Sequence, residues 1–153
     1  MNARTDPTLQ GEYLIVSARF NSLVTERLTA GAEEALLAQG IAAERIQRID
    51  VPGTWELPPV VTAAARSGRY RAVVAIGAVI RGETPHFEHI ARTAIDALGR
   101  IQSETSTPVG LGILTTDTLE QALNRAGGKA GNKGMQAAQA ALYTADVLAK
   151  FHP

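Results

Sequence analysis

Cysteine is absent from the 153-residue sequence, and other features that would point to a particular class of protein are absent with it. Without cysteine the chain can form neither a disulfide nor a thiolate metal site. No apolar run approaches the roughly 20 residues of a membrane-spanning helix. Residues 1–12 hold no apolar segment that could act as a signal peptide. We therefore expect a cytoplasmic protein that does not engage a membrane.

Charge of one sign is also missing, because 15 Lys and Arg residues balance 15 Asp and Glu residues. A net charge near zero gives no long-range attraction to nucleic acid or to an anionic membrane. The composition, 45% hydrophobic and 20% charged, is that of one ordinary globular domain. We predict a polar N-terminal tail over residues 1–12 and a single domain over residues 13–153, which is long enough to bury a core of its own.

Short apolar runs alternate along the chain with segments in which apolar residues recur at helical spacing. The runs predict strands at residues 13–18, 71–80 and 108–114, and we expect a further strand at about residues 45–51. After Arg71, the segment at residues 71–80 is apolar throughout, which is typical of a central strand buried on both faces. Alternation of this kind predicts an α/β fold, a flavodoxin-like three-layer sandwich with a four-stranded parallel sheet and helices on both faces. Ligands bind at the carboxyl ends of the strands in such sheets.

Small polar residues and glycine mark the ends of the predicted helices. Gly40 is expected to end the first helix. Pro85 is expected at the first position of the third helix. The predicted N-caps are Asn21 or Ser22, Thr54, Thr84, Thr116 or Asp117, and Asn132 for the five helices in order.

Several familiar motifs are missing. The sequence has neither the phosphate-binding G-x-x-x-x-G-K-[ST] pattern nor the G-x-S-x-G pattern of serine hydrolases. Gly110 and Gly112 begin like a dinucleotide-binding pattern, but they lie within a predicted strand and a third glycine is absent. We therefore expect them to serve strand packing.

Metal binding is a weaker hypothesis. Glu83, His86 and His89 have residue types and a spacing that could converge on one metal ion. However, Pro85 begins the predicted helix between Glu83 and His86, so the three side chains need not share a helical face. We predict no metal site.

The turn at residues 82–86 is the strongest candidate site in the sequence. A glycine-containing turn between a parallel strand and a helix exposes backbone N–H groups that can bind an anion. The Thr84 hydroxyl adds a donor, and His86 is of the residue type that exchanges protons near pH 7. We interpret the turn as a phosphate site with His86 beside it. An ordinary capped helix with a surface histidine remains the alternative.

Two further features allow a functional and a structural interpretation. Residues 125–134 are rich in glycine and carry Arg125, Lys129 and Lys133 between two predicted helices. These cations either complement a helix C-terminus or hold a phosphate, for which the guanidinium of Arg125 is best suited. Phe20, just after the first strand, is either a platform on which a planar ring stacks or a core or lid residue.

Five segments together, in the same order along the chain, resemble the lumazine synthase family. They are Arg19-Phe20-Asn21 and residues 52–58, 77–87, 112–116 and 125–134, and they extend over nearly the whole chain from Tyr13 onward. The resemblance implies condensation of 5-amino-6-(D-ribitylamino)uracil with 3,4-dihydroxy-2-butanone 4-phosphate to 6,7-dimethyl-8-ribityllumazine, the penultimate step of riboflavin biosynthesis. It implies no organic cofactor and no metal.

The resemblance also implies roles for individual residues. His86 is the proton donor and acceptor, and Phe20 stacks on the pyrimidine. The rest of the pyrimidine and ribityl pocket is formed by Thr54, Trp55, Glu56, Ala78, Val79 and Ile80. Glu83 and Thr84 bind the phosphate end of the butanone. A neighbouring subunit contributes Leu111 and Lys133, together with Arg125 against the phosphate.

The resemblance extends to assembly. The family forms pentamers, and in many bacteria twelve pentamers close into an icosahedral shell of about 60 subunits. Residues 127–133 lack the insertion associated with free pentamers, which favours the shell. Small-molecule substrates and riboflavin synthase are the implied partners. Leu111 departs from the family pattern, because many relatives carry an aromatic residue there, so an aromatic contact from the second subunit is not implied.

Two other functions could use the same features. A flavodoxin-like binding module could hold FMN or another phosphorylated ligand at the turn without turnover. A purely structural shell protein would have no use for Phe20, His86 and Arg125 together, and their presence favours the enzyme.

Overall fold

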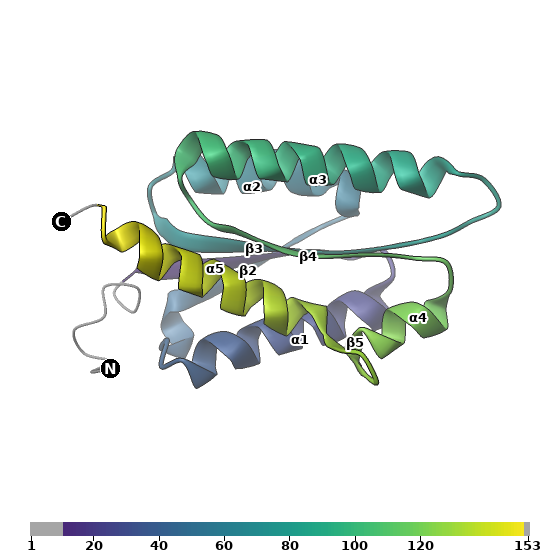
Figure 1. Ribbon diagram of the computed structural model, residues 1–153, viewed down its shortest axis with the longest axis horizontal. Helices are drawn as coiled ribbons and strands as arrows, with labels where there is room; N and C mark the ends of the chain where they lie inside the picture. Colours follow the sequence, from purple (N-terminus) through teal and green to yellow (C-terminus); the bar gives the residue numbers. More distant parts are fainter. Residues whose placement is uncertain (1–10, 152–153) are drawn as a thin grey trace.

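The computed structural model describes residues 11–151, and in this part of the chain a central sheet lies between two layers of helices. Figure 1 shows α2 and α3 covering one face of the sheet, while α1, α4 and α5 cover the other. The sheet is parallel throughout, in the order β2-β1-β3-β4. This arrangement confirms the predicted α/β three-layer sandwich with a four-stranded parallel sheet.

The main elements lie close to the predicted segments. The strands of the sheet are β1 (Glu12–Ala18), β2 (Ile46–Val51), β3 (Tyr70–Ile80) and β4 (Val109–Thr116). The helices are α1 (Ser22–Ala38), α2 (Leu57–Arg66), α3 (His86–Thr105), α4 (Leu119–Asn124) and α5 (Lys133–Ala149). Two 3-10 turns, Ala43–Arg45 and Thr54–Glu56, precede β2 and α2, and a small hairpin of β5 (Ala126–Gly128) and β6 (Gly131–Asn132) precedes α5. No helix within residues 11–151 is both long enough and apolar enough to cross a membrane.

The core is divided in two by the sheet, and β3 supplies side chains to both halves. Successive side chains of a strand point to opposite faces. Accordingly Val74 and Ile76 pack with α1 and α5, whereas Val73 and Ala75 pack with α2 and α3. The unbroken apolar run in the sequence therefore reflects burial on both faces, as predicted.

Small residues bring α1 and α5 close together on one face of the sheet. A Cβ atom on Gly134 would overlap the backbone carbonyl group of Leu28, and one on Gly31 would overlap the side chain of Asn132. On β4, a Cβ atom on Gly110 would lie 2.5 Å from the carbonyl oxygen of Ala137. These glycines are needed for close packing of α5 against α1 and the sheet, which agrees with the strand-packing interpretation of Gly110.

Two of the predicted helix ends are found as expected. The side chain of Asn132 accepts a hydrogen bond from the Met135 N–H group at 3.0 Å and so caps α5. Gly40 follows α1 with a φ angle of 93°, in the left-handed region that favours glycine.

Other predicted caps were wrong, for identifiable reasons. Thr54 does not cap an α-helix, because Pro58 and Pro59 lack the N–H groups that would bond back to residues 54 and 55. The chain forms a 3-10 turn there, and α2 begins at Leu57. At α4, Thr118 and Gln121 form a reciprocal capping box, so neither Thr116 nor Asp117 is the N-cap.

The start of α1 agrees with the prediction in position but not in its hydrogen bond, and the start of α3 differs by one residue. Asn21 occupies the N-cap position of α1, but its side chain makes no capping hydrogen bond. Pro85 is the N-cap of α3 rather than its first residue, and Thr84 lies one position earlier. The Thr84 hydroxyl still accepts a long hydrogen bond from the His86 N–H group, at 3.4 Å.

We predict that Gly134→Ala lowers the free energy of unfolding by about 2 kcal/mol or more, because the backbone of Leu28 cannot easily move away from the added methyl group. Gly99→Ala is the matched control. Gly99 lies within α3 and a Cβ atom there meets nothing within 4 Å, so this variant should gain up to about 1 kcal/mol from helix propensity. Urea unfolding followed by circular dichroism, at one protein concentration, measures both. Equal stabilities of the two variants would contradict the packing account.

Candidate functional site

A pocket of about 460 Å³ opens at the carboxyl ends of the strands, where ligands of parallel α/β sheets bind. The floor of the pocket is the end of β3, which extends further than β1. The pairing of β1 with β3 ends at Ser17 and Ile76, whereas β4 stays paired with β3 as far as Ile80 and Thr116. The end of β3 is therefore covered by β4 on one side and open on the other, and the pocket lies on this open side.

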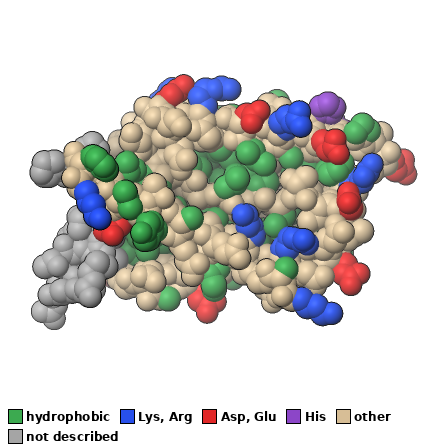
Figure 2. Space-filling model, viewed as in Figure 1, with side chains coloured by type: hydrophobic (Ala, Val, Ile, Leu, Met, Phe, Trp, Pro, Cys, Tyr) green, Lys and Arg blue, Asp and Glu red, His purple; other side chains and the backbone are tan. Residues whose placement is uncertain are grey.

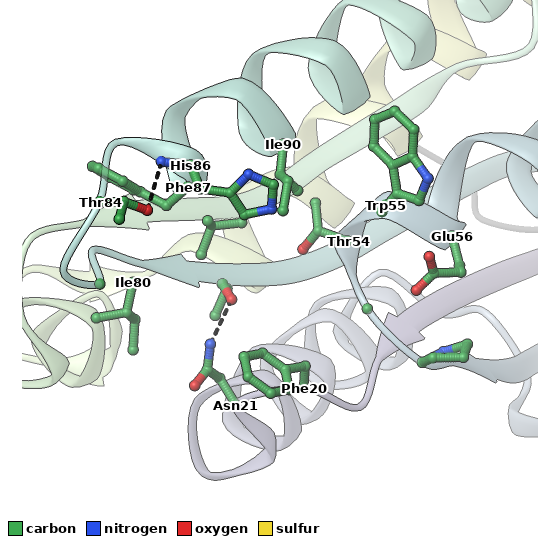
Figure 3. Close-up of a pocket in the computed structure, with 15 residues that line it drawn as sticks. Phe20, Asn21, Thr54, Trp55, Glu56, Ile80, Thr84, His86, Phe87 and Ile90 are labelled. Atoms are coloured by element: carbon green, nitrogen blue, oxygen red, sulfur yellow. Dashed lines mark hydrogen bonds between the residues drawn. The ribbon is translucent and has the colours of Figure 1, made fainter.

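Most of the residues that the sequence predicted to bind substrate come together in this pocket. They lie on the connections that follow β1, β2 and β3, on the last residues of β3 itself and at the start of α3 (Figure 3). The predicted residues in the lining are Phe20, Thr54, Trp55, Glu56, Ala78, Val79, Ile80, Thr84 and His86.

Phe20 is held at the mouth of the pocket by the backbone and not by side-chain packing. The N–H groups of Arg19 and Phe20 donate to the carbonyls of Val51 and Pro52, at 2.8 and 2.9 Å. The Phe20 side chain is 73% exposed, so it is not a core residue. An exposed phenyl ring on a fixed backbone is suited to stacking on a planar ligand.

The connection after β2 supplies the opposite wall. Thr54 is buried and lies against β3, where Gly77 makes room for it: a Cβ atom on Gly77 would be 2.5 Å from the Thr54 hydroxyl oxygen. Trp55 is 57% exposed and Glu56 is partly buried. The pocket thus combines aromatic and apolar surface with a hydroxyl and a carboxylate (Figure 3).

The turn between β3 and α3 brings a histidine and open backbone donors to the same pocket. His86 is the first residue of α3, and Figure 3 shows its imidazole on the pocket side, toward Thr54 and Ile90. Within residues 11–151, no protein acceptor is hydrogen-bonded to the N–H groups of Gly82 or Glu83. A Cβ atom on Gly82 would meet nothing within 4 Å, so packing within the chain does not require glycine there.

Phe87 anchors this turn beneath the pocket. Its side chain is 8% exposed and packs with Val79 and Ala91. The guanidinium carbon of Arg81 lies 5.8 Å from the centre of the Phe87 ring, and Arg81 also forms a 3.5 Å ion pair with Asp117 after β4. These contacts tie the start of α3 to the ends of β3 and β4, and so fix the position of His86.

The remaining predicted residues do not line this pocket in the described chain. Glu83 lies in the same turn but is exposed outside the lining. Leu111 is 38% exposed on the edge strand β4. Lys133 begins α5, and Arg125 follows α4, where its guanidinium donates to the Gln121 carbonyl at 3.3 Å.

Arg125 lines a different hollow, of about 340 Å³, together with residues from the ends of β4 and the start of α3. Figure 2 shows a surface between the two helix layers on which apolar side chains gather, with Lys and Arg side chains close by. Leu111 and Arg125 thus belong to surfaces other than the wall of the main pocket.

Sequence reasoning missed several residues of the pocket. Asn21 was assigned only as a cap, Asn21 and Phe87 fell within segments of the resemblance without a role in the site, and Ile90 was not named as a site residue. Ile90 could have been predicted as a pocket residue, because it follows His86 by four residues and lies on the same face of the helix. Among residues 11–151, no group of three or more His, Asp or Glu side chains is placed to hold a metal ion.

The fold and the pocket define a small-molecule-binding protein of the three-layer α/β class. Comparison with known proteins specifies the family. Residues 10–149 match the family model described as 6,7-dimethyl-8-ribityllumazine synthase. The chain therefore belongs to the 6,7-dimethyl-8-ribityllumazine synthase family.

Individual relatives agree with this family assignment. A protein of Anaeromyxobacter sp. (strain Fw109-5) with this name is 56% identical over 134 residues, which cover 88% of this chain and 82% of the relative. A protein of the same name from Nitratidesulfovibrio vulgaris (strain DSM 19637 / Miyazaki F) is 45% identical over 137 residues, 90% of this chain and 88% of the relative. Proteins of this family are transferases of riboflavin biosynthesis, which agrees with the activity that the sequence resemblance implied.

We predict that Phe20→Ala changes the free energy of unfolding by less than about 0.5 kcal/mol, because the ring is 73% exposed. Phe87→Ala is the comparison, with a ring that is 8% exposed, and should cost about 3 kcal/mol. Chemical unfolding measures both. A large loss in Phe20→Ala would contradict its assignment as a surface platform.

Proposed function

We propose that this protein condenses 5-amino-6-(D-ribitylamino)uracil with 3,4-dihydroxy-2-butanone 4-phosphate to 6,7-dimethyl-8-ribityllumazine, with release of one phosphate and two waters. The observation that carries the proposal is the pocket at the end of β3 in a chain of this family. The pocket joins an exposed aromatic ring, a histidine and a turn with open N–H donors. Its volume of about 460 Å³ suits two small substrates held together.

The proposed reaction consists of bond changes that each move a proton. The 5-amino group of the pyrimidine adds to the butanone carbonyl, and water leaves to give an imine. Loss of the proton from C3 lets the C4 phosphate leave and gives an enol, which takes up a proton at C4 and becomes a ketone at C3. The ribitylamino nitrogen then adds to this ketone to close the ring, and a second water departs. Holding both substrates in register lowers the entropic cost of the first step.

His86 is proposed as the group that takes up and returns these protons. It begins α3 on the pocket side of the helix and is held there by the packing of Phe87 on Val79. An imidazole is the side chain best matched to proton transfer near neutral pH. The exposed position of His86 leaves it accessible to a substrate in the pocket.

The pyrimidine and ribityl chain are proposed to lie along the open side of β3. Phe20 would stack on the ring, while Thr54, Trp55 and Glu56 supply the other wall. No strand of the described chain pairs with residues 78–80 on this side, which leaves backbone groups for the substrate. The backbone groups on this side belong to Ala78 and Ile80, and the Ala78 carbonyl already accepts from Asn21. The backbone groups of Val79 face β4, so Val79 would contribute as part of the pocket lining.

The phosphate of the butanone is proposed to bind at residues 82–86. Glu83 and Thr84 lie in this turn, and the positive end of the α3 dipole favours an anion there. Arg125 is assigned to the same phosphate, but from a neighbouring copy of the chain, together with Leu111 and Lys133. Within one chain none of these three residues lines the main pocket, which supports this division.

A homo-oligomer follows from sites that are divided between two copies. We propose pentamers that assemble into a shell of twelve, because the joint before α5 is a tight hairpin of β5 and β6 without an insertion. Riboflavin synthase, which uses the lumazine product, is the proposed protein partner, and the cytoplasm is the proposed location.

We expect the purified protein to form 6,7-dimethyl-8-ribityllumazine from the two substrates faster than the uncatalysed condensation, as followed by absorbance. His86→Ala should slow turnover by about tenfold to a thousandfold with the fold intact, in line with the size of acid–base contributions. His89→Ala is the control, because His89 is exposed on α3 outside the pocket lining. Equal rates in the two variants would remove the role given to His86. A yellow protein with bound flavin and no condensation would favour a binding module.

A mixing experiment tests whether sites are shared between chains. His86→Ala and Arg125→Ala are each expected to be weakly active alone, the second mainly through a raised KM for the phosphate substrate. Hetero-oligomers assembled from equal amounts of both should regain about a quarter of wild-type sites, since a site needs His86 from one copy and Arg125 from the next. Light scattering gives the mass of each assembly. A mixture no more active than the mean of its components would contradict shared sites.

A further inference from the structure

The open side of β3 has a carbonyl group that the sheet itself leaves unpaired. In a parallel sheet, the N–H and C=O groups of one residue bond to the same neighbouring strand, and successive residues alternate between neighbours. The N–H groups of Val73 and Arg81 donate to carbonyls of the β4 side, those of Pro108 and Thr116. The backbone N–H and C=O groups of odd-numbered β3 residues therefore point toward β4. Those of even-numbered residues, including the carbonyl of Ala78, point toward β1.

The backbone of β1 turns away before it can reach the Ala78 carbonyl. β1 ends at Ala18, and the next two N–H groups, those of Arg19 and Phe20, both donate toward the β2 side, to Val51 and the residue after it. No backbone donor from β1 is then left for Ala78. The sheet opens at this point, between Phe20 and the end of β3.

The side chain of Asn21 closes this opening. Its Nδ2 atom donates to the Ala78 carbonyl oxygen at 2.8 Å, a bond that crosses 57 residues of sequence and is visible in Figure 3. Asn21 reaches β3 because its backbone is in the left-handed region, with φ 63° and ψ 47°. Asparagine enters this region more easily than most residues. The contact also explains why Asn21 stands at the N-cap of α1 without capping it.

We propose that Asn21 is a positioning residue for the pyrimidine substrate, an inference that rests on the proposed function. Phe20 and Ala78 both line the pocket, and Asn21 joins the backbone of one to that of the other. The Phe20 ring, at 73% exposure, has little packing of its own to fix its place. The Asn21 amide therefore sets the spacing between the aromatic platform and the strand end against which the ring of the substrate is held.

Two variants separate the hydrogen bond from the backbone conformation. Asn21→Gly keeps the left-handed conformation accessible but removes the donor. Asn21→Asp keeps the shape but turns an acceptor toward the Ala78 carbonyl. Ser106→Gly is the matched control, because Ser106 is the other non-glycine residue with positive φ in the described chain, at 55°, and precedes β4 at the opposite end of the sheet.

Both Asn21 variants should raise the KM for the ribitylaminouracil about tenfold, the effect of one lost hydrogen bond. The KM for the butanone phosphate should stay within about twofold, and thermal unfolding should match Ser106→Gly, since the bond lies at the edge of the fold and not in its core. Unchanged KM values, or equal losses for both substrates, would overturn the positioning role.

Hydrogen exchange gives a readout that does not depend on turnover. Without substrate, the amides of Arg19 and Phe20 should exchange at least about tenfold faster in Asn21→Gly than in the wild type or Ser106→Gly, because the corner has lost a tether to β3. Unchanged exchange would overturn the inference even if the wild type is active. A wild type without condensation activity but with this difference in exchange would instead reject the proposed function and retain the tether.

Discussion

The backbone hydrogen bonds that hold β3 between β1 and β4 determine where the residues of the pocket can lie. Because β4 accompanies β3 to Ile80 and β1 stops earlier, the sheet ends in a step and not in a straight edge. The step exposes backbone along one side of a strand that is otherwise fully enclosed. Each connection that lines the pocket begins at the carboxyl end of a strand beside this step. The pocket is therefore a consequence of strand lengths, and its chemistry is added by the turns.

The two faces of the sheet contribute differently to this arrangement. On the face covered by α1 and α5, glycines allow the backbones of the two helices to come into contact. On the other face, the larger side chains of α2 and α3 pack with β3, and Phe87 extends that packing to the strand end. Packing on both faces of the sheet holds the strands from whose ends Phe20, Trp55 and His86 follow. These side chains can therefore be exposed while their backbone stays in place. Exposed groups of this kind depend on their backbone for order.

The fold was predictable from the sequence to a greater extent than the details of its turns. Apolar runs identified β1, β3 and β4, because burial leaves a strong pattern in the sequence. The edge strand β2 is mostly exposed and carries no such run, although its position was predicted. The cap at Thr54 was mispredicted because the missing N–H groups of Pro58 and Pro59 outweigh the preference of threonine for a cap. Asn21 was correctly predicted as the N-cap residue of α1, but the bond of its side chain was not, because its partner, Ala78, is distant in sequence and no local rule reports such a contact.

Candidate roles for Phe20 and His86 could be predicted because both follow the end of a strand closely. Thr54 was predicted from its position only as a cap, and its role in the site came from the resemblance. The positions of Leu111 and Arg125 outside the pocket depend on how β4 and α4 are placed in three dimensions. Neither spacing nor composition contains this information, and the sequence resemblance supplied their assignment to a second subunit.

The exposure of Phe20 and Trp55, at 73% and 57%, has a thermodynamic consequence. In the free protein these rings are hydrated on an open, preformed surface, and a planar substrate that stacks there displaces this water. Removal of apolar surface from water lowers the heat capacity of the system. Binding of a planar ligand to this surface should therefore have a negative heat-capacity change, even where the binding enthalpy is small. The affinity for that ligand should vary with temperature as a hydrophobic contact does.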